Sequence, residues 1–130
     1  MGEGGRFEKK CTAFKPYIFL ERRIKMADLE SIFQRKLKHE IQEMFPECII
    51  TKNETYIQGF PDLTVYYKDK YATLECKRSA NAKHQPNQDY YISKMNRMGG
   101  FSRFICPENK DDVLTEMAEY FEGRRGKNDI

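Results

Sequence analysis

Two carboxylates and one lysine in the middle of the sequence have types and spacing that suit metal-assisted chemistry. Asp62 precedes one short apolar run, and Glu75 and Lys77 lie at the end of the next one. Side chains alternate along a strand, so Glu75 and Lys77 share a face. If the two runs form a hairpin that turns about Asp69, positions whose numbers sum to about 138 face each other. Asp62 then lies opposite Cys76 and diagonally next to Glu75, and the three ionisable side chains converge at one end of the hairpin.

Such a cluster suits the hydrolysis of a phosphodiester bond. Two carboxylates held close together repel each other unless a cation lies between them, and oxygen ligands are those that Mg²⁺ or Mn²⁺ prefers. A lysine beside that cation can orient or deprotonate an attacking water, and it can neutralise charge that develops on a phosphoryl group. We therefore expect a Mg²⁺ (or Mn²⁺) site at this end of the hairpin.

The same residues form a pattern found in a known group of enzymes. Pro61-Asp62, followed thirteen residues after Asp62 by Glu75-Cys76-Lys77, resembles the motif of the PD-(D/E)XK nuclease superfamily. The resemblance implies a restriction-endonuclease-like core and metal-dependent cleavage of DNA, commonly by a homodimer. It also implies that Asp62, Glu75 and the backbone carbonyl of Cys76 hold the metal, and that Lys77 attends the attacking water.

Two further positions resemble a smaller branch of that superfamily, which includes the virus-type replication-repair (VRR-NUC) nucleases and phage Holliday-junction-resolvase-like proteins. In that branch the first helix supplies a glutamate and the helix after the lysine supplies a glutamine. Glu30 and Gln88 are the matching residues, with Glu40 and Gln85 as their rivals. The resemblance implies that Glu30 completes the metal shell or a second metal site, and that Gln88 orients the lysine or the substrate.

Structural roles for the same residues remain open. Asp62 could cap a turn after Pro61, and Glu75 with Lys77 could form a solvent-facing ion pair on an edge strand. His39 and His84 lack partners at metal-ligand spacing, so we interpret both as surface or structural residues.

The pattern of apolar residues predicts an α/β fold that positions these side chains. Apolar residues recur at helical spacing from Ala27 until Pro46, with Asp28 placed to cap the helix. Strands are expected at residues 48–52, 63–67 and 71–77, then a helix at 87–98, a strand at 101–106 and a helix from Asp111 or Asp112 to Phe121. The strand–helix–strand step predicts a right-handed parallel crossover. The expected architecture is therefore a mixed four-stranded sheet flanked by helices.

Length and charge indicate one domain between basic ends. The chain has 130 residues, with 23 Lys and Arg against 20 Asp and Glu, a net charge of +3. Residues 1–25 hold seven of the basic and three of the acidic side chains, and residues 123–130 hold three and one. We expect a basic arm at 1–25, flexible or interface-forming, a nuclease domain at 26–122 and a basic tail at 123–130. Basic ends are one way to hold a polyanion such as DNA.

Cysteine usage and hydropathy indicate the compartment. The four cysteines are far apart and form no metal-binding pair, so we interpret them as free, mostly buried thiols in a reducing compartment. No apolar run near the start is long enough for a membrane span or a signal sequence. We expect a soluble cytoplasmic protein without membrane contact, in the host cytoplasm if a phage encodes it.

The sequence predicts a metal-dependent DNA endonuclease, structure-specific for junctions or flaps, of phage or mobile-element replication and repair. The alternative is a non-cleaving nucleic-acid-binding module on the same fold. A third hypothesis is a protein–protein adaptor whose basic ends are only solubilising tails.

Overall fold

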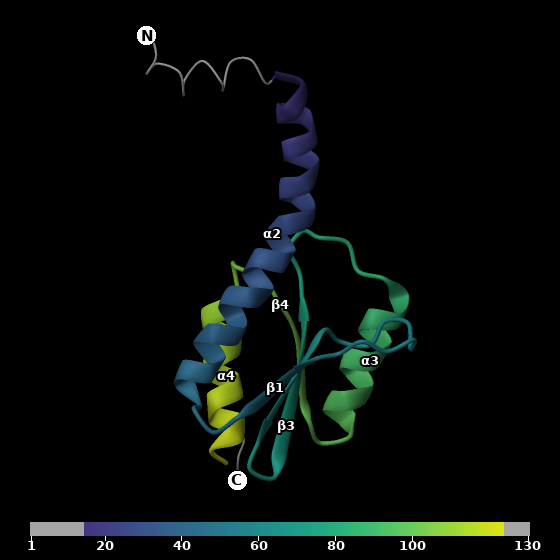
Figure 1. Ribbon diagram of the computed structural model, residues 1–130. Helices are drawn as coiled ribbons and strands as arrows, with labels where there is room; N and C mark the ends of the chain where they lie inside the picture. Colours follow the sequence, from purple (N-terminus) through teal and green to yellow (C-terminus); the bar gives the residue numbers. More distant parts are fainter. Residues whose placement is uncertain (1–14, 124–130) are drawn as a thin grey trace.

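The computed structural model describes the backbone of residues 15–123 and the side chains of residues 28–123. Figure 1 shows its elements in chain order: α2 (Lys15–Met44), β1 (Ile49–Lys52), β2 (Leu63–Tyr67), β3 (Lys70–Cys76), α3 (Pro86–Arg97), β4 (Phe101–Ile105) and α4 (Lys110–Phe121). The predicted order of helices and strands is confirmed.

The strands form a four-stranded mixed sheet in the order β1-β2-β3-β4. β1, β2 and β3 pair antiparallel, whereas β3 and β4 pair parallel through the crossover that contains α3. β3 is therefore an interior strand with a hydrogen-bonded neighbour on each side. The α/β architecture and the mixed sheet agree with the sequence prediction.

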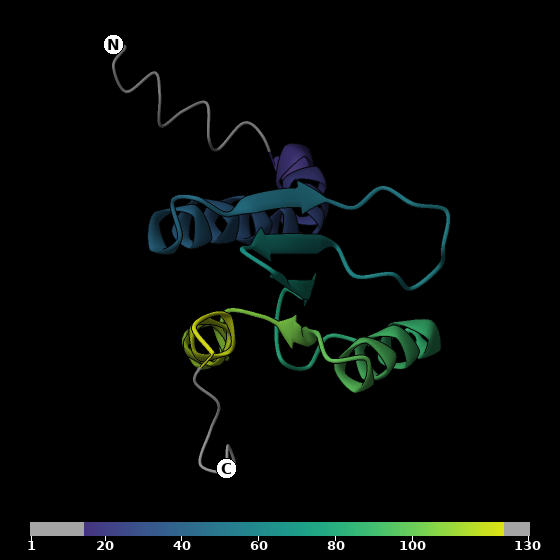
Figure 2. The same cartoon turned by 90° about the horizontal axis from the view of Figure 1, so that it is seen from below.

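The two faces of the sheet are covered by different helices. One face packs with α2 and α4 into the hydrophobic core, to which α2 contributes Leu37, Ile41 and Phe45 and β3 contributes Leu74 and Cys76. The opposite face carries α3, and Figure 2 shows α3 and α4 on opposite sides of β4. Glu75 and Lys77 alternate with the core residues, so they face the α3 side.

The register of the β2–β3 hairpin differs by one residue from the prediction. Tyr67 pairs with Lys70, and Leu63 pairs with Leu74, so facing positions sum to 137 instead of 138. The turn consists of two residues, and Lys68 adopts a left-handed conformation with φ of 57°. Continued by one residue, this register places Asp62 opposite Glu75, not opposite Cys76. The corrected register thus brings the two carboxylates to the same face, directly across from each other.

The first helix begins earlier than predicted. α2 starts at Lys15 and runs unbroken to Met44, so Asp28 is not its N-cap and residues 15–25 of the predicted arm are helical. The N-terminal half of α2 extends beyond the other elements (Figure 1). Leu29, one of the apolar residues at helical spacing, is 52% exposed. Residues 1–14 and 124–130 lie outside the described part, and with them most of the predicted arm and tail.

Other element boundaries differ by one residue or so. β3 begins at Lys70 and ends at Cys76, α3 begins at Pro86 instead of Asn87, and α4 begins at Lys110. The three described cysteines, Cys48, Cys76 and Cys106, are free and buried, as predicted, and Cys11 lies outside the described residues. Within residues 15–123, no helix combines the length and apolar character needed to cross a membrane.

Candidate functional site

Asp62 lies at the end of the β1–β2 loop and is fixed from two sides. The backbone N–H of Asn53 donates to the Asp62 carbonyl at 2.7 Å, and the Asn53 amide donates to the Pro61 carbonyl at 3.0 Å. The Asp62 carboxylate accepts a hydrogen bond from the Cys76 N–H at 2.9 Å. The carboxylate therefore bonds across the hairpin instead of capping its own turn, which argues against the turn-capping role.

Glu75 and Lys77 are buried where β3 ends. Glu75 is 5% exposed and Lys77 is 9% exposed, and the Lys77 N–H continues the pairing with β4 through the Ile105 carbonyl at 2.8 Å. The Lys77 Nζ lies 3.9 Å from Glu75 Oε2. Because β3 is an interior strand, the interpretation as a solvent-facing pair on an edge strand is wrong.

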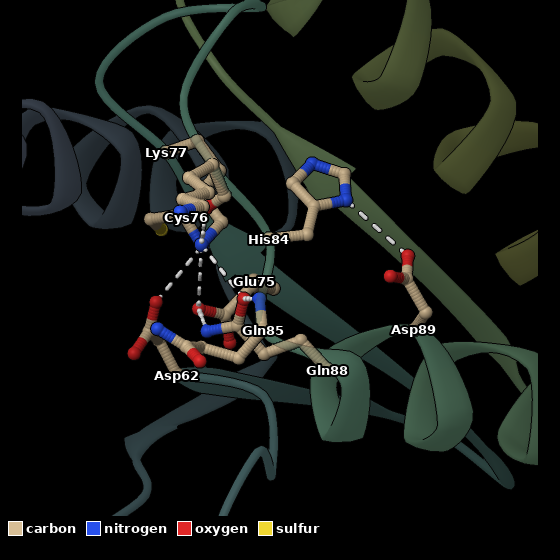
Figure 3. Close-up of polar contacts among 9 residues, drawn as sticks. Asp62, Glu75, Cys76, Lys77, His84, Gln85, Gln88 and Asp89 are labelled. Carbon is tan, nitrogen blue, oxygen red and sulfur yellow. Dashed lines mark hydrogen bonds and ion pairs between the residues drawn. The ribbon is translucent and has the colours of Figure 1, made fainter.

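Gln88, in the first turn of α3, joins Glu75 to Lys77 (Figure 3). Its Nε2 donates to Glu75 Oε2 at 2.8 Å, and its Oε1 accepts from Lys77 Nζ at 2.8 Å. The backbone N–H of Gln85 also donates to the same Oε1, at 3.0 Å. Two donors on one side and a carboxylate on the other fix the orientation of this amide. Gln88 is thus the residue that reaches the site, and Gln85 contributes its backbone.

Burial disfavours ionisation of the Glu75 and Asp62 carboxyl groups. Burial raises the pKa of Glu75 to about 8, and the nearby Asp62 charge adds to the rise, which Lys77 only partly opposes. Burial also raises the pKa of Asp62, although the Cys76 N–H bond lowers it. Within the described residues, Glu75 Oε1 is a buried oxygen with no hydrogen-bond partner. A cation beside Glu75 would favour the ionised form of its carboxyl group, and it would give Oε1 a partner.

Of the two glutamates proposed on α2, Glu30 is near the site and Glu40 is not. Burial and the Asp62 charge raise the pKa of Glu30, and Lys77 and Arg78 act in the opposite direction. Glu40 forms an ion pair with Lys110 at 2.8 Å. Since α2 begins at Lys15, Glu30 is far from the helix N-terminus, so an interaction with the helix dipole does not explain it.

The remaining candidates divide between backbone and surface roles. The Cys76 side chain points to the core face, where Gln34 of α2 bonds to it and burial raises the pKa of its thiol, so only its backbone is available on the site face. His84 stacks on Phe104 at 3.8 Å between ring centroids and pairs with Asp89 at 3.2 Å. His84 thus has a structural role, as predicted, and His39 is exposed.

The donor set fits a hard divalent cation that keeps several waters. In residues 28–123, no group of three or more His, Cys, Asp or Glu side chains is arranged to hold a metal. Mg²⁺ is commonly bound by one or two carboxylates plus water. Asp62 and Glu75 supply two, and Glu75 Oε1 is free of hydrogen bonds. The residues present fit Mg²⁺ or Mn²⁺ with water completing the shell.

Two contributors to the site were missed by sequence reasoning. The Lys83 carbonyl accepts a hydrogen bond from Lys77 Nζ at 3.1 Å, and Asn53 holds the Asp62 segment. A carbonyl has no sequence signature, and an asparagine after a strand is too common to single out.

Comparison with known proteins gives no relative for this chain. No family model matches it, and no match was found among curated proteins or solved structures.

Proposed function

We propose that this chain is a metal-dependent nuclease that hydrolyses phosphodiester bonds in DNA, on a core of the restriction-endonuclease type. The observation that carries the proposal is a single one. Glu75 and Lys77 are buried, held by the same Gln88 amide, and face Asp62, yet one oxygen of Glu75 has no donor. Buried polar atoms in a purely structural network are almost always satisfied.

Each residue has a distinct task in this proposal. Asp62, Glu75 and the Cys76 carbonyl would hold Mg²⁺ or Mn²⁺, with Glu30 on the outer side of the cluster. The bound ion would supply a water of lowered pKa and would neutralise charge on the phosphate. An ammonium group has three donors, and Lys77 uses two of them on Lys83 and Gln88. Its third N–H is left for the attacking water or a phosphoryl oxygen.

Cleavage of plasmid DNA by the full-length chain tests this proposal. We expect cutting with Mg²⁺ or Mn²⁺, none with EDTA, and DNA binding without cutting in Ca²⁺, which tolerates looser coordination. Lys77→Ala should not cut, whereas Lys83→Ala should cut, because Lys83 contributes only its backbone carbonyl. Equal cutting rates with and without EDTA refute the metal assignment.

A non-cleaving nucleic-acid-binding module is the second candidate. It is favoured by the lack, among the described residues, of a group of three or more His, Cys, Asp or Glu side chains that could hold a metal. Salt-dependent retention of DNA without cleavage in any divalent cation would select it.

The biological setting follows from the resemblance alone. We propose a homodimer in the cytoplasm, acting on branched or flap DNA during phage or mobile-element replication and repair. Gel filtration and cleavage of junction, flap and linear duplex side by side test this setting.

A further inference from the structure

A hollow of about 320 Å³ shares Gln88 with the candidate site. It lies between the β1–β2 loop and the first turn of α3, which run side by side in Figure 1. The residues that line it are Gln58, Gly59, Gln85, Pro86, Asn87 and Gln88.

The two walls of the hollow are in close contact at Gly59. A Cβ atom added there would lie 2.4 Å from the Cβ of Asn87, and Gly59 has a φ of +86°. Only glycine fits this approach and this backbone conformation without strain. Phe60, the next residue, packs edge-on against Tyr91 of α3 at 5.9 Å between ring centroids. The loop is therefore held against α3, and the shape of the hollow is defined.

The lining of the hollow is polar and uncharged. No Lys, Arg, Asp or Glu contributes to it. Gln88 is committed to Glu75 and Lys77. The side-chain amides of Gln58 and Asn87 have no hydrogen-bond partner among the described residues. Two amides, each with a donor and an acceptor, thus remain for a ligand.

This lining does not suit a phosphate. Pro86 has no N–H, and the Gln88 N–H is bonded to the Gln85 carbonyl at 2.9 Å, so the start of α3 offers little to an anion. The lining suits a flat, neutral group with hydrogen-bonding edges. Nucleobases are such groups, and Asn and Gln side chains pair with their edges through both the amide N–H and the carbonyl.

We propose that this hollow binds one unpaired nucleobase of the substrate, next to the phosphodiester that is cut. The inference rests on the proposed function, because Gln88 lines the hollow and also forms hydrogen bonds with Glu75 and Lys77. A base can occupy a hollow only after it has left the helical stack. The volume is near the lower limit of about 300 Å³ for ligand pockets, which suits one base.

Tyr56 supplies a second contact for unpaired DNA. It is 98% exposed and lies two residues before Gln58 on the same loop. Exposed aromatic rings stack on unpaired bases regardless of sequence. The substrate class is therefore DNA with an unpaired nucleotide at the cut position, as in a bulge, gap or flap, in preference to continuous duplex.

Binding of a fluorescent base tests the hollow without cleavage. The probe is a duplex with a single bulged 2-aminopurine, bound in EDTA by the wild type and by a double variant, Gln58→Ala with Asn87→Ala. We expect the double variant to bind the bulged probe about tenfold more weakly, from the loss of amide pairing, and to bind continuous duplex as the wild type does. The control is Asn81→Ala, an exposed amide outside the hollow. Equal affinity of the wild type and the double variant for the bulged probe overturns the inference.

Cleavage separates this inference from the proposed function. In Mg²⁺ we expect the wild type to cut a bulged strand about tenfold faster than the same strand with an abasic bulge, and the double variant to lose this difference. If the wild type cuts both equally, the nuclease proposal stands and the base site is refuted. If the wild type cuts neither but binds the bulged probe through the two amides, the base site stands and the hydrolytic function is refuted.

Discussion

Glu75→Gln tests whether the carboxylate cluster is strained without a metal. The pKa of Glu75 is raised from 4.5 to about 8 by burial and by the Asp62 charge. Between these values the folded protein binds a proton that the unfolded chain has released. The free energy of unfolding of the wild type therefore falls as the pH rises from about 4.5 to about 8. The glutamine variant keeps the shape of the side chain and lacks this titration.

The structure sets the size of the effect. Each pH unit in this interval corresponds to about 1.4 kcal/mol, so the loss reaches at most about 5 kcal/mol. Rearrangement of nearby polar groups and water reduces such penalties, and we expect about 2 kcal/mol. For a domain of this size, 1 kcal/mol changes Tm by roughly 4 °C. The glutamine variant should gain about 8 °C in Tm relative to the wild type between pH 5 and pH 9.

Thermal unfolding in EDTA across this pH range measures the difference. Glu43→Gln, which removes an exposed carboxylate from α2, is the matched control and should follow the wild type. At pH 8, Mg²⁺ at one hundred times its Kd should stabilise the wild type by about 2.7 kcal/mol and so raise its Tm. The same Mg²⁺ concentration should raise the Tm of Glu75→Gln much less. A Tm gap between Glu75→Gln and the wild type that does not change with pH refutes the reasoning.

Three further substitutions, the last with a matched control at Glu40, address the neighbouring residues. Lys77→Ala should abolish cleavage but keep the Mg²⁺-induced rise in Tm, because both carboxylates remain; loss of that rise contradicts this prediction. Gln88→Ala removes the amide that bonds to Glu75 Oε2 and Lys77 Nζ. It should lower the free energy of unfolding, measured in urea, by about 1–3 kcal/mol, and it should lower kcat. A variant with wild-type kcat would exclude the positioning role. Glu30→Gln should slow cleavage. Glu40→Gln breaks only the half-buried pair with Lys110 and should cost about 1 kcal/mol. Equal cleavage rates for the two variants remove Glu30 from the site.

The elements of the sheet could be predicted because the relevant patterns are local. Apolar runs bounded by charged or glycine-rich turns located each strand to within one or two residues, and Gly99-Gly100 marked the end of α3. The hairpin register could not be predicted, because the charged segment around Asp69 allows a turn of two or three residues. The left-handed conformation of Lys68 selects the shorter turn, and no feature of the sequence reports it.

The start of α2 was missed for a different reason. Residues 15–27 show no apolar period, so the prediction relied on Asp28 as a cap. The helix continues upstream because no proline or glycine interrupts residues 17–45, and Pro16 is well placed in its first turn. The absence of a helix breaker was the available signal, and it is weaker than a periodic pattern.

Strand alternation alone places Glu75 and Lys77 on one face, so their proximity was predictable, whereas the position of Asp62 across from Glu75 depends on the hairpin register, which differs by one residue from the prediction. Leu74 and Cys76 lie in the core with exposed fractions of 0%, and they alternate with Glu75 and Lys77 along one interior strand. The hydrophobic contacts of one face thus fix the positions of charged groups on the other. A shift of this strand by one residue would move both charged side chains into the hydrophobic core and remove both apolar side chains from it, so the register is strongly selected. The same packing that stabilises the sheet therefore holds the Asp62 and Glu75 carboxyl groups close together in a buried place, and the raised pKa of Glu75 is the consequence.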